Sequence, residues 1–132
     1  ARLVDVEGHA LERLVAQLYQ ERSRKGVGDF SLTSRITGYW NNKDTEIDLV
    51  AVDGDNNRIR FGTVKRSAEK LVGDVAGFQG HVARFLAACP AYASYHRELV
   101  GFTVEASADV RNQLKRQGML CEDLADLTRG LT

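Results

Sequence analysis

Two acidic side chains and one lysine fall where a folded β-hairpin would bring them close together. Glu46 and Asp48 lie two residues apart at the start of an apolar run, and Lys65 closes the next β-rich run. Side chains at positions i and i+2 of a strand share a face, so Glu46 and Asp48 are expected to be neighbours. A carboxylate pair beside an ammonium is suited to holding a divalent cation and orienting water for phosphodiester hydrolysis.

The two runs, residues 46–53 and 58–65, flank a turn-rich centre and therefore predict a β-hairpin. If the hairpin is symmetric about this turn, Asp48 lies opposite Thr63 and Glu46 lies opposite Lys65. The predicted hairpin thus gathers two carboxylates, a hydroxyl and an ammonium near one end of a sheet.

The run that carries Asp48 is apolar at nearly every other position, as in strands covered on both faces. Strict alternation puts Ile47 and Leu49 on the face opposite Asp48. An aspartate is unusual in such a strand, so its presence here favours a functional site. The alternative is a solvent-exposed hairpin face, where Glu46 and Lys65 make an ordinary cross-strand pair of ~0.2–1 kcal/mol.

Further elements must position this hairpin. Apolar residues at helical spacing predict a helix over about residues 4–23 and a second one over 75–89, which Pro90 ends. Ser107 is suited to capping the start of a third helix, over 108–117, and Gly118 is suited to ending it. Strands are predicted over 30–40, 99–104 and 119–121, followed by a C-terminal helical turn. The order predicts an α/β domain with one mixed sheet covered by helices.

This pattern resembles the PD-(D/E)xK nuclease superfamily, and in particular the nuclease-like C-terminal domain of archaeal and bacterial AAA-type ATPases. The resemblance implies a restriction-endonuclease-like αβββαβ core and an ATPase domain upstream in the same chain. The matching segments are Gly8–Glu12, Gly38–Trp40, Glu46–Val52 and Phe61–Lys65.

Carried over residue by residue, the superfamily's catalytic positions fall on Glu12, Asp48 and Lys65. The resemblance implies a Mg²⁺ or Mn²⁺ site with Asp48 as principal ligand and Lys65 as the residue that positions the attacking water. The implied metal ligands are Asp48, Glu12, Glu46 and the backbone carbonyl of Val64.

One position departs from the superfamily pattern. The acidic residue expected two positions before Lys65 is Thr63, a neutral and weaker ligand for a hard cation. Three functions therefore stay open: a metal-dependent nuclease, a degenerate nuclease fold that binds nucleic acid or protein, and a scaffold without a ligand at this site.

The stretch from residue 61 to residue 97 is the only locally basic part of the chain. Within it, Lys65, Arg66 and Lys70 are candidates for contacts with DNA phosphates, although a solvent-exposed rim explains them equally well. His81 is expected to be a partly buried or surface histidine rather than a general base. Tyr39 and Trp40 are expected to pack in the core or at its rim.

Composition sets wider limits on function. The chain has 132 residues, enough for one domain, and its 18 basic and 18 acidic residues cancel, which excludes a global attraction to nucleic acid or membranes. It has no signal pattern, membrane-spanning run or nucleotide-binding motif, which favours a soluble, cytoplasmic domain without ATPase activity of its own. Cys89 and Cys121 are expected to be reduced. The first residue is not Met, so we expect a domain of a longer protein.

Overall fold

The computed structural model describes residues 2–40 and 45–131, without the side chains of residues 2–8. It is an α/β structure in which helices flank one mixed sheet of five strands, as predicted. The elements in chain order are α1 (Arg2–Arg24), β1 (Thr37–Trp40), β2 (Glu46–Asp53), β3 (Arg58–Val64), α2 (Ala68–Ala88), a 3₁₀ turn (Pro90–Tyr92), β4 (His96–Thr103), α3 (Ala108–Arg116), β5 (Met119–Asp123) and α4 (Leu124–Thr128).

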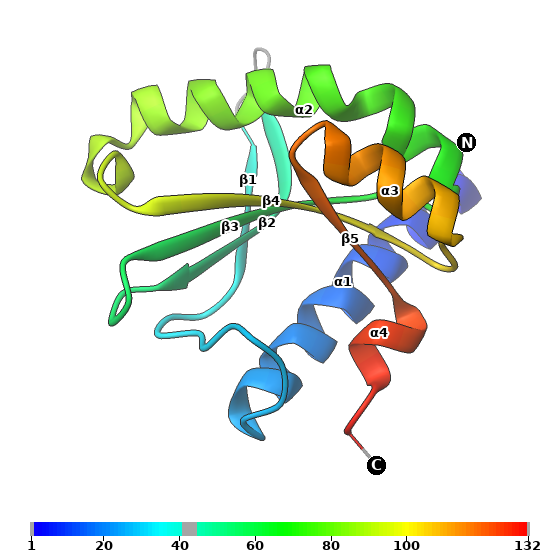
Figure 1. Cartoon of the computed structure of the whole chain (residues 1–132), viewed down its shortest axis with the longest axis horizontal. Helices are drawn as coiled ribbons and strands as arrows, with labels where there is room; N and C mark the ends of the chain where they lie inside the picture. The colour runs from blue at the N-terminus through cyan, green and yellow to red at the C-terminus, as the bar shows by residue number, and fades with distance from the viewer. Residues whose placement is uncertain (1, 41–44, 132) are drawn as a thin grey trace.

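The strands lie in the sheet in the same order as in the chain (Figure 1). The first three strands form an antiparallel meander, whereas β3, β4 and β5 run parallel to one another. Parallel neighbours need a long crossover connection, and here α2 and α3 supply it. Both crossover helices cover one face of the sheet, and α1 and α4 cover the other.

Each face of the sheet has its own apolar core. Burial of these side chains is the main force that holds the helices on the sheet. The core under α2 and α3 includes Ile47, Val50, Phe61, Leu71, Val75, Phe78, Phe85 and Leu114. The core over α1 and α4 includes Leu11, Val15, Tyr19, Phe30, Leu49, Ala51, Val64, Phe102 and Leu127.

The hairpin of β2 and β3 has the predicted register from the pair Leu49–Gly62 to the pair Asp53–Arg58, and the predicted pairs of Asp48 with Thr63 and of Glu46 with Lys65 are not part of this ladder. Strict alternation along β2, however, is wrong: Ile47 packs in the core under α2, whereas Leu49 packs in the core over α1. The cause is a register shift against β1, where Thr37 pairs with Val50 but Tyr39 pairs with Ile47. Strand β2 therefore has one extra residue here, a β-bulge that includes Asp48.

Gly38 lies opposite this bulge. A Cβ atom built on Gly38 would lie 3.1 Å from the backbone oxygen of Asp48 and 3.4 Å from that of Ile47. The absence of a side chain thus lets β1 approach the bulged backbone closely.

Two predicted elements differ by about seven residues at one end, and β4 begins three residues before its predicted start. The strand expected over residues 30–40 is only Thr37–Trp40, because Phe30 and Ile36 enter the core over α1 from a loop. Helix α2 begins at Ala68 rather than near Val75, and its added first turns bury Ala68 and Leu71.

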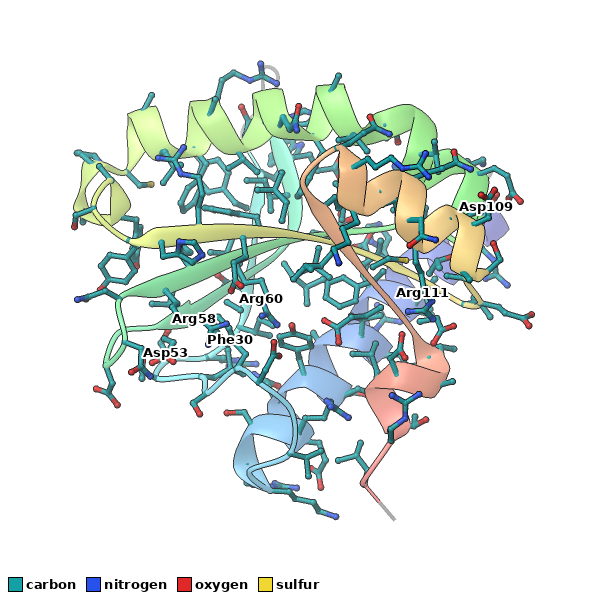
Figure 2. The ribbon with its side chains drawn as sticks, viewed as in Figure 1. Phe30, Asp53, Arg58, Arg60, Asp109 and Arg111 are labelled. Atoms are coloured by element: carbon teal, nitrogen blue, oxygen red, sulfur yellow. The ribbon has the colours of Figure 1, made fainter. Side chains whose placement is uncertain are left out.

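A charged cluster joins α1 to the sheet below β3 (Figure 2). The guanidinium of Arg60 is 3% exposed and lies 3.1 Å from Asp29 and 3.2 Å from Glu98. It also donates a hydrogen bond to the hydroxyl of Tyr19 and lies over the ring of Phe30, 4.8 Å from its centroid. The cluster ties α1 and the following loop to the centre of the sheet.

None of the helices in the described part of the chain combines the length and the apolar character that a membrane-spanning segment needs.

Candidate functional site

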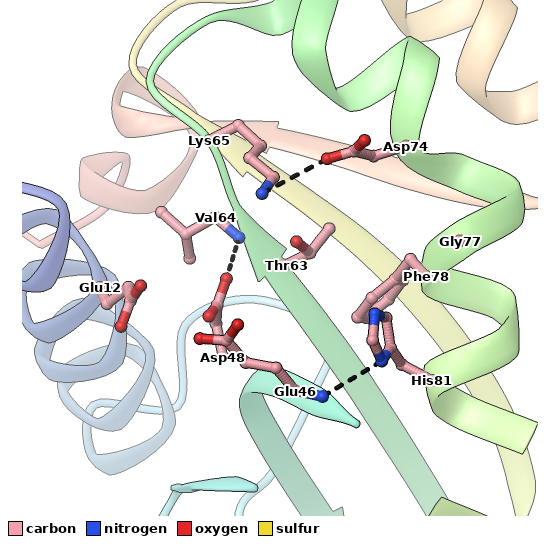
Figure 3. Close-up of a pocket in the computed structure, with 10 residues that line it drawn as sticks. All are labelled: Glu12, Glu46, Asp48, Thr63, Val64, Lys65, Asp74, Gly77, Phe78 and His81. Carbon is pink, nitrogen blue, oxygen red and sulfur yellow. Dashed lines mark hydrogen bonds and ion pairs between the residues drawn. The ribbon is translucent and has the colours of Figure 1, made fainter. Parts of the chain in front are cut away.

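A polar cavity of about 220 Å³ lies between α1, the adjoining ends of β2 and β3, and α2 (Figure 3). Four of the described residues that line it are acidic, and Lys65 is the only Lys or Arg among them. The lining residues are Glu12, Glu46, Asp48, Thr63, Val64, Lys65, Asp74, Gly77, Phe78 and His81.

Asp48 lies at the centre of this group, where the β-bulge directs it to the cavity. Its Oδ2 accepts a 2.7 Å hydrogen bond from the backbone N–H of Val64 on β3. Burial nevertheless raises the pKa of Asp48 to about 6. The Val64 hydrogen bond is the largest opposing effect and the Lys65 ammonium adds to it, whereas the nearby carboxylates of Glu12 and Glu46 raise the pKa.

Lys65 follows the last residue of β3. Its backbone N–H donates to the carbonyl of Phe102 on β4 over 2.9 Å, which fixes the start of its side chain. Its Nζ lies 3.3 Å from Oδ2 of Asp74 on α2. The ion pair at Lys65 thus links β3 to α2, rather than making the predicted cross-strand pair with Glu46.

Glu12 and Glu46 approach the cavity from different elements. The side chain of Glu12, on α1, is 30% exposed, and its Oε2 lies 3.5 Å from Nδ1 of His9. Glu46 is exposed at the start of β2, where its backbone N–H donates to Nδ1 of His81 over 3.1 Å. The structure therefore brings both predicted supporting ligands to the cavity that Asp48 lines.

The buried Thr63 presents a neutral hydroxyl where the superfamily pattern has a carboxylate. The contact of Val64 with Asp48 is made by its backbone N–H, whereas the resemblance assigned its carbonyl to a metal. Thr63 and Val64 line the cavity, but neither adds negative charge to it.

The chemistry of the donors fits a hard divalent cation. Carboxylate oxygens are the ligands that Mg²⁺ and Mn²⁺ prefer, and a cation would relieve the carboxylate repulsion that adds to burial in raising the pKa of Asp48. The fit is one of donor chemistry and not of spacing, because no three His, Cys, Asp or Glu side chains of residues 9–40 and 45–131 are grouped closely enough to hold a metal ion. The residues that would hold it are Asp48, Glu12 and Glu46.

The other predicted contacts lie outside the cavity. Arg66, in the β3–α2 connection, and Lys70, in the first turn of α2, are exposed and do not line it. Tyr39 packs as expected, edge-on against Phe85 at 4.8 Å, whereas Trp40 at the end of β1 is 68% exposed.

The sequence analysis missed the contribution of α2 to the cavity. Asp74, Gly77, Phe78 and His81 occupy positions i, i+3, i+4 and i+7 of the helix and form one stripe that faces β2 and β3. The helical spacing of these four residues could have indicated the shared face. The predicted helix began near residue 75, however, so Asp74 was placed outside it.

Two comparisons with known proteins bear on this site. No curated protein matches the chain. A family model for archaeal and bacterial proteins of unknown function, named DUF234, matches residues 2–73. The matched segment runs from α1 through β3 into α2 and includes Glu12, Asp48 and Lys65. The chain therefore belongs to the DUF234 family of archaeal and bacterial proteins.

Proposed function

We propose that this domain is a divalent-metal-dependent phosphodiesterase that acts on DNA. The observation that carries the proposal is the convergence of Asp48, Glu12, Glu46 and Lys65 on one polar cavity. Three of these residues are carboxylates from two elements, and the fourth supplies an ammonium. The resemblance to PD-(D/E)xK nucleases names the same residues from motif order and spacing.

The roles follow from the chemistry of each side chain. Asp48 would be the principal ligand of Mg²⁺ or Mn²⁺, supported by Glu12 and Glu46, and the cation would neutralise the phosphate and activate water. Lys65 would orient that water through its ammonium, and the hydrogen bond of its backbone to β4 fixes where the side chain begins.

The β-bulge and the Val64 amide contribute positioning. The bulge directs the Asp48 carboxylate to the cavity, and the Val64 N–H holds Oδ2 at 2.7 Å. One carboxylate oxygen is thereby fixed, and the other is free of that bond and available to a ligand. Arg66 and Lys70, exposed where β3 leads into α2, would bind phosphates of the DNA backbone.

The direct test is cleavage of supercoiled plasmid DNA by the purified protein in Mg²⁺ or Mn²⁺. We expect nicking in the wild type, and a loss of roughly 10²-fold or more in Lys65→Ala and Asp48→Asn. The matched control is Lys115→Ala, an exposed lysine in the last turn of α3. Equal cleavage by Lys65→Ala, or no cleavage by the wild type, would refute the proposal.

A second function has its own supporting observation. Thr63 lacks the usual carboxylate, and the described carboxylates do not form a compact metal-binding group. These features favour a module that retains the nuclease fold and binds DNA or a protein without cleavage. Salt-sensitive DNA binding by a protein that leaves the plasmid intact would establish DNA binding of this kind.

We also propose, from the resemblance, that the domain is attached to an ATPase in a longer chain and acts in the cytoplasm. A P-loop motif encoded upstream in the full-length gene would support the attachment, and the absence of such a motif would refute it.

A further inference from the structure

The carboxylate missing from β3 has a counterpart on the opposite wall of the cavity. Thr63 leaves Lys65 without the acidic neighbour that the superfamily pattern places two residues before it on the same strand. Asp74 on α2 lies across the cavity, and its Oδ2 is 3.3 Å from Nζ of Lys65 (Figure 3).

Helix geometry explains why Asp74 reaches this place. Asp74, Gly77, Phe78 and His81 lie on one stripe of α2, and the stripe lines the cavity from the side opposite α1. Phe78 and the neighbouring Val75 are buried in the core under α2, which fixes the rotation of the helix about its axis. Core packing of α2 therefore places Asp74 beside Lys65.

The space around this stripe is open. A Cβ atom built on Gly77 would meet no atom within 4 Å, so the helix leaves room for a ligand beside Asp74. The side chains of Lys65 and Asp74 are 36% and 53% exposed, so the pair borders the open part of the cavity. Solvent and ligand both have access to the ammonium that Asp74 contacts.

From these contacts we infer that Asp74 is the positioning residue for Lys65: its carboxylate, on α2, pairs with the ammonium across from the strand position where Thr63 supplies no charge. Asp74 holds the ammonium over the cavity, whereas Asp48, Glu12 and Glu46 serve the cation. The inference rests on the proposed function. It assigns no direct contact with substrate to Asp74.

The contact itself is tested without catalysis. The folded protein is treated with an acylating N-hydroxysuccinimide ester, and modification of Lys65 is measured by mass spectrometry relative to Lys70. We expect Asp74→Asn to raise the relative labelling of Lys65 by about twofold to fivefold, the range for loss of an exposed ion pair. The matched control is Glu69→Asn. Glu69 is an exposed residue on the same helix, and its carboxylate accepts a hydrogen bond from the hydroxyl of Ser67.

Asp74→Glu should restore the protection of Lys65, because it keeps the charge. Unchanged labelling in Asp74→Asn, or an equal increase in Glu69→Asn, would overturn the assignment. Thermal unfolding of each variant confirms that the comparison is made between folded proteins.

The positioning role is tested by cleavage kinetics. We expect Asp74→Asn to lower kcat by about tenfold with KM within about twofold of the wild type, and Asp74→Glu to recover most of the rate. In a Lys65→Ala background, Asp74→Asn should have no further effect. Wild-type kcat in Asp74→Asn would overturn the role.

If the wild type does not cleave DNA, the proposed function fails, and the catalytic role of Asp74 fails with it. The labelling result then still decides whether Asp74 holds Lys65, so the two failures are distinguishable.

Discussion

The backbone N–H of Val64 donates a 2.7 Å hydrogen bond to the Oδ2 atom of Asp48, across the two strands of the hairpin. This bond fixes the carboxylate at the end of the sheet where β2 is bulged. It is also too weak to offset burial, since the pKa of Asp48 is still raised to about 6. The folded protein therefore holds a carboxyl group that keeps its proton to a higher pH than an ordinary aspartate does.

The first prediction concerns stability and pH. The pKa of Asp48 is about 6 in the folded protein against 3.8 for an unperturbed aspartate, so the folded state binds the proton more tightly. The ionised carboxylate therefore destabilises the fold, by an amount that grows from about pH 4 to pH 6 and is full above that. Asp48→Asn keeps an acceptor for Val64 and should stabilise the protein by about 1–3 kcal/mol at pH 8.

At pH 4 the same variant should differ from the wild type by less than about 0.5 kcal/mol, because the penalty is then mostly absent. Urea denaturation at the two pH values measures both differences. An equal gain at pH 4 and pH 8 would show that ionisation of Asp48 is not the cause.

The second prediction concerns divalent cations. If Asp48, Glu12 and Glu46 bind Mn²⁺ only in the folded protein, saturating Mn²⁺ at pH 8 should stabilise the wild type by roughly 1–3 kcal/mol and raise Tm by about 5 °C. Asp48→Asn should lose most of this shift. The control is Asp109→Asn, an exposed carboxylate in the first turn of α3, which should keep it. A shift of equal size in all three proteins would indicate nonspecific binding.

The third prediction concerns the strand that carries Lys65. A Cβ atom built on Gly62 would lie 2.6 Å from Cε2 of Phe102 and 3.2 Å from Cβ of Leu49. Gly62→Ala should therefore destabilise the protein by about 1–3 kcal/mol through overpacking. Gly73→Ala on α2 is the control, because its Cβ would meet nothing within 4 Å and alanine should stabilise the helix by about 0.5–1 kcal/mol. Thermal and denaturant unfolding distinguish the two signs.

The fourth prediction concerns the charged cluster around Arg60. Arg60→Ala leaves the hydroxyl of Tyr19 without its buried donor and removes one of the two guanidinium groups that contact Glu98, which keeps its ion pair with Arg58; we expect a loss of about 3 kcal/mol. Arg116→Ala, at an exposed position in the last turn of α3, should change stability by less than about 0.5 kcal/mol. Comparable losses of stability in the two variants would show that the buried contacts of Arg60 do not cause the loss.

Much of this fold could be predicted from local patterns. The hairpin register follows from two β-rich runs around a short turn, and Ser107 does cap α3 by accepting from the N–H of Val110. The convergence of Asp48 and Lys65 on one cavity follows from the same hairpin. These features depend on residues close in sequence, which is why periodicity and turn chemistry were sufficient.

The parts that could not be predicted depend on contacts between distant elements. The bulge at Asp48 is defined only by the pairing of β2 with β1, and the alternation of residues within β2 does not show it. The Lys65–Asp74 pair depends on how the core rotates α2 over β3. Phe30 and Ile36 resembled strand residues because a loop that fills a core has the same apolar composition.

Because of the extra residue in β2, the position of Asp48 at the site depends on the number of residues in this strand. Removing Leu49, which follows Asp48 in the bulge, would restore regular pairing with β1 and change which side of the sheet the preceding residues face. We therefore expect relatives of this protein to tolerate amino-acid replacements along β2 far more readily than insertions or deletions there.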